Sequence, residues 1–213
     1  SFTDSSGCDL DQDARSKAIQ KRVLLEQIQI LELAVHHPQQ QLEKLFGGKV
    51  NLETVRHPDK ITGFLLPASG GIDSLKVLHD RQQPFKLAVQ DQKEISGLLI
   101  GHGNYEWGAR YLCEIRYGIR LEFQKADNVV AVFLCLGCGH SGVLLGEKKY
   151  EHDMQSEHLD KRDAFAAVAE IVKRALPEAE AIQKISIEKR KNSYNSEPYQ
   201  QQIERLRSEL NSL

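Results

Sequence analysis

The sequence predicts an α+β fold in which an antiparallel β-meander packs against helices, with a helical arm at each end of the chain. Three observations lead to this fold class. Apolar residues recur at three- and four-residue steps near the N-terminus and again near the C-terminus, and between residues 111 and 124 they alternate with polar residues. We expect an N-terminal helical arm over 1–60, an α+β core domain over 61–180 and a C-terminal helical tail over 181–213.

The N-terminal arm is predicted to be helical from about Asp13, after a polar tail over residues 1–12. The helical spacing continues until Pro38, and one or two further turns over 39–46 end at Gly47-Gly48. The apolar residues of this pattern are Ile19, Val23, Leu24, Ile28, Leu31 and Val35. A helix with such a stripe packs on a core or on a second subunit.

The core domain is predicted to begin with short elements. Ile61–Leu66 is a short apolar run typical of a strand, and a short helix is predicted over 72–82 after a glycine-rich break. The segment 85–100 fits either a strand at its start or a helix that ends near Ile100.

The meander is the clearest element of the sequence. Apolar and polar residues alternate over 111–117 and again over 119–124, Gly118 provides a tight turn, and Val129–Leu136 is apolar throughout. Links this short join antiparallel strands, because a parallel pair needs a crossover of about a dozen residues. We therefore predict three sequential antiparallel strands over Tyr111–Leu136, the last one covered by helix. The residues expected to be buried are Cys113, Ile115, Leu121 and Phe123.

The C-terminal third is predicted to be a loop followed by helices. Residues 137–160 are polar and rich in glycine and histidine, which indicates a loop or a partly ordered insertion. Asp163 stands where it can cap an amphipathic helix over 164–176, and Pro177 ends that helix. A final helix is predicted from the spacing of Ile203, Leu206, Leu210 and Leu213.

The composition of the chain argues against several classes of protein. No apolar run reaches the roughly 18–20 residues that cross a bilayer, and the first residues lack the features of a signal peptide. The four cysteines are too sparse for a secreted disulfide scaffold, so we expect a cytoplasmic protein without membrane contact. A net charge of −2 excludes a uniformly basic coat for nucleic acid, although it allows a local basic patch.

One short motif indicates phosphate chemistry. Ser69-Gly70-Gly71-Ile72-Asp73-Ser74 follows the predicted strand and opens the predicted helix. It resembles the pyrophosphate-binding loop of the ATP-pyrophosphatase (PP-loop) superfamily, in which glycines let backbone amides approach a phosphate at a helix N-terminus. The resemblance implies an ATP-binding enzyme that uses Ser69, Gly70, Gly71, Asp73 and Ser74. The alternative is a plain turn with Asp73 or Ser74 as the helix cap.

A second pattern pairs a histidine with a cysteine. His102 stands between Gly101 and Gly103, and Cys138 opens the run Cys138-Gly139-His140-Ser141-Gly142. The pair resembles the catalytic dyad of caspase-like cysteine peptidases, in which a base lowers the pKa of a nearby thiol. The same region admits a zinc site, because Cys135, Cys138, His140 and His102 are suitable ligands. Cys135 can equally be a small apolar core residue, and no metal is expected.

The meander carries a third resemblance. The alternating run Tyr111–Gln124, the apolar strand after it and the glycine- and histidine-containing end resemble the central sheet of RelE/ParE-superfamily proteins. Nucleases of that family cut messenger RNA on the ribosome without a metal or other cofactor. The resemblance implies that Arg116 and Arg120 hold phosphate, that His140 acts as acid or base, and that Lys148, Lys149 and Tyr150 contact the substrate. A solvated strand face, with Arg116 and Arg120 paired to Glu114 and Glu122, is the alternative.

The sequence therefore favours a nucleic-acid-acting protein, a RelE-like ribonuclease or a relative of its fold, with RNA as the favoured partner. The caspase-like peptidase and the PP-loop enzyme are the enzymatic alternatives. The non-enzymatic alternative is an assembly module that binds a helical partner or a second copy of itself through 13–46 and 200–213.

Overall fold

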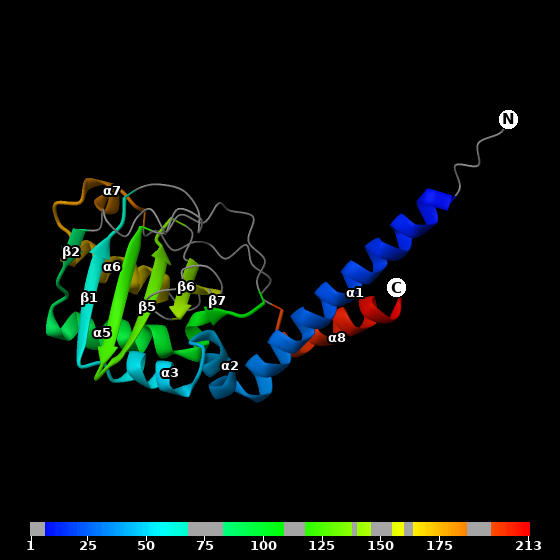
Figure 1. Cartoon of the computed structure of the whole chain (residues 1–213), viewed down its shortest axis with the longest axis horizontal. Helices are drawn as coiled ribbons and strands as arrows, with labels where there is room; N and C mark the ends of the chain where they lie inside the picture. The colour runs from blue at the N-terminus through cyan, green and yellow to red at the C-terminus, as the bar shows by residue number, and fades with distance from the viewer. Residues whose placement is uncertain are drawn as a thin grey trace. The chain divides into compact units, whose positions relative to one another are not determined.

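The computed structural model describes residues 7–67, 83–108, 118–137, 140–145, 155–159, 164–186 and 197–213 (Figure 1). Within these ranges the side chains of 7–11, 140, 144–145 and 155–159 lie outside the description. The chain divides into two compact units. One consists of Ser1–Pro38 with Tyr194–Leu213, and the other, which we call the core unit, is Gln39–Ser193.

The first unit is a pair of helices from the two ends of the chain. The 30-residue helix α1 (Gly7–His36) packs against α8 (Tyr199–Asn211). Both helices were expected from their apolar spacing, but α1 begins at Gly7, so the predicted polar tail is too long. Its first turns contain only Cys8 and Leu10 as apolar residues, too few to show a helical period. The residues that pack together are Leu24, Ile28 and Leu31 of α1 with Ile203 and Leu206 of α8.

Arg207 of α8 also pairs with Glu32 of α1. No helix in the described part of the chain combines the length and the apolar character that a membrane span requires.

The core unit opens with two short helices, α2 (Pro38–Leu45) and α3 (Lys49–Arg56). Gly47 and Gly48 separate them with φ of 71° and 129°, backbone conformations that favour glycine. The sequence did not predict α3, because only Leu52 and Val55 mark its buried face. Since α3 contacts β4 and β5, residues 39–60 belong to the core unit, whereas the predicted boundary stood at residue 60.

Seven strands in the described residues form one sheet, with every neighbouring pair antiparallel and the order β2-β1-β4-β5-β6-β7-β3. The predicted α+β fold is therefore confirmed. The strands are β1 (Lys60–Leu65), β2 (Gln83–Phe85), β3 (Tyr105–Glu106), β4 (Ile119–Lys125), β5 (Asn128–Cys135), β6 (His140–Leu145) and β7 (Gln155–Leu159).

Two of the three predicted strands form the expected hairpin, β4 and β5, which are joined by a two-residue turn. The other edge of β4 pairs with β1, and Gly118 continues this ladder through hydrogen bonds to Leu66 and Leu134. The predicted tight turn at Gly118 and the predicted pairing of 119–124 with the segment before it are therefore wrong, because alternation marks a strand but does not reveal its partner. Leu121 and Phe123 are fully buried, as expected. The predicted strand over 111–117, with Cys113 and Ile115, lies outside the described residues, as does the predicted helix over 72–82.

The prediction of a loop over 137–160 is wrong for two segments, β6 and β7. Both segments are short and β7 is polar, and the three apolar residues that end β6, Val143–Leu145, were too few to stand out from the glycine- and histidine-rich sequence around them. The neighbouring strand β5 provides the pairing edge that makes β6 a strand, because β-structure depends more on its neighbours than on intrinsic preference.

Helices cover one face of the sheet (Figure 1). They are α3, α5 (Val89–Ile100) and α6 (Ala164–Ala175), which confirms the helix predicted over 164–176. The ambiguous segment 85–100 is mostly helical, with its first residue at the end of β2. Two short helical turns, His102–Asn104 and α7 (Glu180–Gln183), complete the described elements.

Two contacts fix the position of α5 and of the sheet edge. The hydroxyl of Ser96 donates a hydrogen bond of 2.8 Å to the carbonyl of Val55, which ties α5 to α3. At the edge, Gly63 of β1 faces Phe85 of β2, and a Cβ at position 63 would stand 2.3 Å from the ring. The ring therefore occupies the space that a side chain at position 63 would need.

Candidate functional site

The strand register places two of the predicted site residues on the same face of the sheet. Residues directly opposite in neighbouring strands share a face, and so do residues two apart in one strand. Arg120 is opposite Phe133, Phe133 is opposite Gly142, and His140 is two residues before Gly142. Two strand spacings and two residues along the strand separate the Cα atoms of Arg120 and His140 by about 12 Å.

The same register brings further polar residues into one row. Cys135, His140 and His158 are opposite one another on the adjacent strands β5, β6 and β7. Glu106 of β3 is opposite His158 and extends the row to a fourth strand. The Cα atoms of two directly opposite residues are about 4.5–5.5 Å apart, so His140 and His158 are close neighbours. We call His140, His158 and Glu106 the histidine row.

Sequence reasoning missed His158 and Glu106. His158 falls in the segment predicted as a loop, and Glu106 lies on a two-residue strand at the other edge of β7. The available signal was the content of histidine in 137–160, but the pairing of β6 with β7 could not be deduced from it.

Arg120 is nearly buried, with 5% of the residue exposed. It forms an ion pair with Glu122, two residues further along β4, and its guanidinium carbon lies 5.3 Å from the centroid of the Phe64 ring. Such a contact with the face of an aromatic ring adds to the ion pair in holding the guanidinium. The alternative reading expected a solvated strand face with pairs across a hairpin, whereas Arg120 is nearly buried and pairs with Glu122 of its own strand. Arg116 and Glu114 lie outside the described residues.

His102 lies at the end of α5 among aromatic side chains. Its ring stacks on Trp107 with 5.0 Å between the centroids, and its backbone carbonyl accepts a 3.1 Å hydrogen bond from the Trp107 indole. The hydroxyl of Tyr105 donates to the carbonyl of Leu99 at 2.6 Å, which ties this cluster to α5. Cys138 lies outside the described residues, so the structure does not describe the predicted dyad as a pair.

The other predicted site residues are also outside the description: Lys148, Lys149, Tyr150, Ser69, Gly70, Gly71, Asp73 and Ser74. Cys135 is buried, with 3% of its surface exposed, as expected for a small apolar core residue. Among the described side chains, no group of three or more histidines, cysteines or carboxylates is arranged to hold a metal.

A cleft of about 880 Å³ lies elsewhere in the core unit, between the end of α3, the segment that leads into β1, and α5. Its lining contains four charged residues, Arg56, Asp59, Lys60 and Lys93, together with the exposed Val89 and with Gly97 of α5. Sequence reasoning did not find this cleft, because its basic residues are distant in the chain and belong to no motif.

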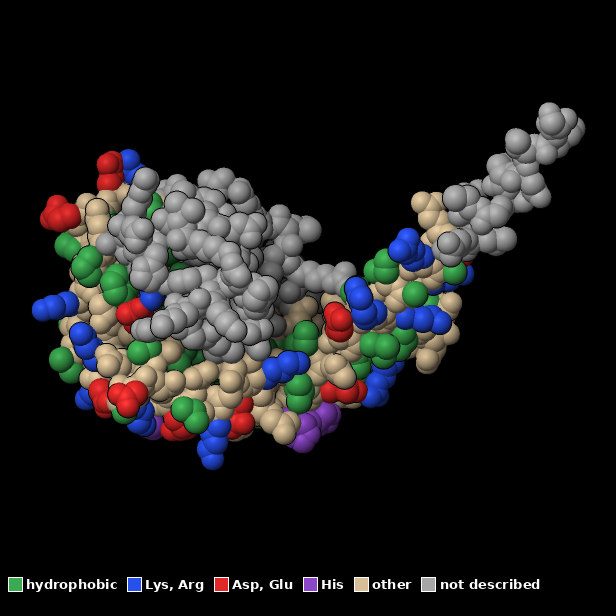
Figure 2. Space-filling model, in the orientation of Figure 1, with side chains coloured by type: hydrophobic (Ala, Val, Ile, Leu, Met, Phe, Trp, Pro, Cys, Tyr) green, Lys and Arg blue, Asp and Glu red, His purple; other side chains and the backbone are tan. Residues whose placement is uncertain are grey.

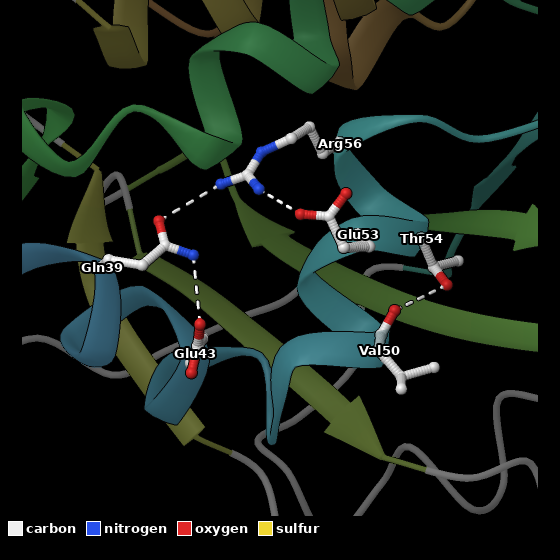
Figure 3. A network of polar contacts seen from close by, with 6 residues as sticks. All are labelled: Gln39, Glu43, Val50, Glu53, Thr54 and Arg56. Carbon is white, nitrogen blue, oxygen red and sulfur yellow. Dashed lines mark hydrogen bonds and ion pairs between the residues drawn. The ribbon is translucent and has the colours of Figure 1, made fainter.

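The charged side chains around the cleft differ in whether they have a partner. Arg56 pairs with Glu53 and donates a hydrogen bond of 3.4 Å to the side chain of Gln39, which in turn donates to Glu43 (Figure 3). A carboxylate oxygen of Asp59 accepts a hydrogen bond of 2.9 Å from the backbone N–H of Ala126, so Asp59 holds the β4–β5 turn.

The side chains of Lys60 and Lys93 form neither an ion pair nor a hydrogen bond with any described residue. Counting partners among the described residues only, the cleft presents two unpaired ammonium groups and one arginine fixed by its neighbours. On the part of the surface that is coloured in Figure 2, basic and acidic side chains are interspersed.

No family model, no curated protein and no solved structure matches the chain.

Proposed function

We propose that the core unit is a ribonuclease that cleaves RNA by general acid–base catalysis on the sheet face that carries the histidine row. The observation that supports this proposal most directly is the cross-strand pairing of His140 with His158. Histidine is the side chain best suited to give and take protons near neutral pH, and this pairing places two of them about 5 Å apart at Cα.

The chemistry needs two proton transfers and no other reagent. One imidazole removes the proton of the ribose 2′-hydroxyl, and the 2′-oxygen attacks the adjacent phosphorus. The bond from phosphorus to the 5′-oxygen of the next nucleotide breaks, and the second imidazole, in its protonated form, gives that oxygen a proton. The products are a 2′,3′-cyclic phosphate and a free 5′-hydroxyl. One proton is taken from the RNA and one is given back to it, and no water is consumed in this step. Atoms and charge therefore balance.

The neighbours of the pair suit supporting roles. Glu106 follows His158 in the row, and a carboxylate beside an imidazole holds it in one tautomer. Arg120 lies on the same face, about 12 Å from His140 between Cα atoms, and we assign it the phosphate-binding role that the resemblance implies. The RelE/ParE-like expectation of an arginine and a histidine on one sheet face agrees with this assignment.

The proposal is tested with a fluorescently labelled single-stranded RNA of mixed sequence and a DNA of the same sequence. We expect the wild-type protein to cleave the RNA in the presence of EDTA, to leave a cyclic phosphate, and to leave the DNA intact because it lacks the 2′-hydroxyl. His140→Ala and His158→Ala should each lower the rate at least about tenfold, with nearly unchanged thermal stability. Each should also remove one limb of a bell-shaped pH profile.

His36→Ala is the matched control, because His36 is an exposed histidine on α1. It should cleave at the wild-type rate. Arg116→Ala should also lose at least about tenfold if the phosphate-binding role implied by the resemblance is correct. Wild-type rates in both histidine variants would refute the proposal, and so would activity that EDTA abolishes.

A further inference from the structure

The cleft beside α5 is separate from the histidine row. Lys60, which lines the cleft, pairs with Gln124 at one end of β4. The histidine row lies near the opposite end of β4, which begins at Ile119. Ile119 is opposite Leu134 of β5, Leu134 is opposite Ser141 of β6, and Ser141 is next to His140. A ligand in the cleft would therefore not occupy the proposed catalytic face.

We infer that this cleft binds a nucleotide-sized phosphorylated small molecule. The first reason is its charge. Lys60 and Lys93 come from β1 and α5, and both are exposed and unpaired among the described residues. Arg56 is held between Glu53 and Gln39, so its guanidinium is fixed before a ligand arrives. The carboxylate of Asp59 is engaged with the backbone N–H of Ala126. Phosphate oxygens suit ammonium and guanidinium donors of this kind.

The second reason is that the cleft is also apolar and has the right size. Val89 is 72% exposed at its rim, and Pro58 and Ile100 belong to its lining. An exposed valine beside unpaired lysines suits a ligand that has a flat apolar part and an anionic part, as a nucleotide has. The volume of about 880 Å³ falls within the range of about 300–1,000 Å³ that is usual for small-molecule sites.

The surroundings of the cleft favour a small anion over a nucleic-acid strand. A strand needs a continuous basic track along its backbone. On α5, Lys93 lies between two acidic positions, Asp91 and Glu94, and both carboxylates are neighbours of Arg174 of α6 at 2.6 Å and 3.8 Å. The positive charge of Lys93 therefore does not continue along α5.

Gly97 offers a way to close the cleft without disturbing the fold. It lies in the interior of α5 and lines the cleft, and a Cβ at this position would meet no atom within 4 Å. A side chain at position 97 therefore enters open space, and the replacement of glycine also favours the helix. Gly97→Leu should fill the volume that a ligand would need.

The experiment is isothermal titration of the full chain with ATP, and in parallel with AMP, adenosine, pyrophosphate and a short single-stranded RNA. We expect ATP to bind more tightly than AMP, and adenosine or pyrophosphate alone to bind weakly, because each supplies only one half of the ligand. Lys60→Ala and Lys93→Ala should each weaken ATP binding about tenfold. Gly97→Leu should abolish it while the melting temperature stays equal or rises.

Lys86→Ala is the matched control, since Lys86 is an exposed lysine just before α5 that is not part of the cleft lining. It should bind ATP as the wild type does. His140→Ala and His158→Ala should also bind ATP normally, so the result does not depend on the proposed ribonuclease. No heat of binding with any of these ligands up to about 1 mM would overturn the inference. RNA binding that Gly97→Leu abolishes, with no ATP binding, would overturn it in favour of a nucleic-acid site.

Discussion

Arg120 lies almost buried in β4, where it pairs with Glu122 and packs over the Phe64 ring. Two contributions of this side chain can be separated: its support of the sheet and its proposed contact with phosphate. A buried ion pair contributes little compared with a well-packed apolar pair, but removing one partner leaves the other charge uncompensated.

We therefore expect Arg120→Met to lower the free energy of unfolding by about 3 kcal/mol, because Glu122 loses its partner in a largely buried place. The double variant Arg120→Met/Glu122→Leu should recover most of this loss, since no unpaired charge is left. Urea unfolding of the three proteins measures both values. A double variant no more stable than Arg120→Met would show that the pair is not the source of the effect.

At the scale of elements, the edge of the sheet depends on one glycine. The β1–β2 pairing brings the Phe85 ring over Gly63 so closely that a Cβ would stand 2.3 Å from it. Gly97 in α5 is the matched position, because a Cβ there meets nothing within 4 Å.

We expect Gly63→Ala to destabilise the protein by about 1–3 kcal/mol, because the buried Phe85 ring must move to make room. Gly97→Ala should instead stabilise it by about 1 kcal/mol, the usual gain when alanine replaces glycine inside a helix. Chemical denaturation of both variants provides the comparison. If Gly63→Ala is as stable as the wild type, the Phe85 ring of β2 does not pack closely on β1 at position 63.

The elements also show which parts of the fold could be predicted from the sequence. Long periodic segments were predicted well: α1, α6, and the pair β4 and β5, whose buried Leu121 and Phe123 alternate with polar neighbours. Short elements such as α3 and β7 were missed, because a few residues with little apolar content show no period, and their pairing or packing decides their structure.

The candidate sites divide in the same way. Arg120 and His140 were singled out from motifs, and the register places them on one face of the sheet. His158 could not be assigned, because its position opposite His140 is set by a strand pairing that the sequence does not reveal. The cleft could not be predicted from the sequence for a related reason. Arg56 and Lys93 are far apart in the chain and share only the space between α3 and α5.

At the scale of the whole molecule, the two ends of the chain form a unit of their own. The apolar faces that were expected to bind a partner or a second copy pack against each other: Leu24, Ile28 and Leu31 of α1 contact α8. Binding of a helical partner through these arms stays a prediction, and it would have to use other surfaces or displace α8. Ile19 and Leu25 of α1 are each 52% exposed and remain available.

We expect removal of residues 197–213 to make the protein self-associate, because it uncovers the apolar face of α1 that α8 covers. Light scattering after size-exclusion chromatography should give a larger mass for the shortened chain than for the full one. Arg207→Ala is the control, since it removes only the exposed pair with Glu32 and should leave the mass unchanged. An unchanged mass for the shortened chain would contradict the role assigned to α8.

The pairing of α1 with α8 also has a consequence for the order in which the protein is made. Arg207 and Glu32, which meet in this unit, are 175 residues apart in the chain. At a synthesis rate of about 5–20 residues per second, α1 leaves the ribosome about 10–35 s before its partner helix. The whole core unit is synthesised in that interval and can fold first, because all its residues precede α8. During this time α8 is not yet available, so the apolar face of α1 that α8 covers in the finished protein is uncovered in the growing chain.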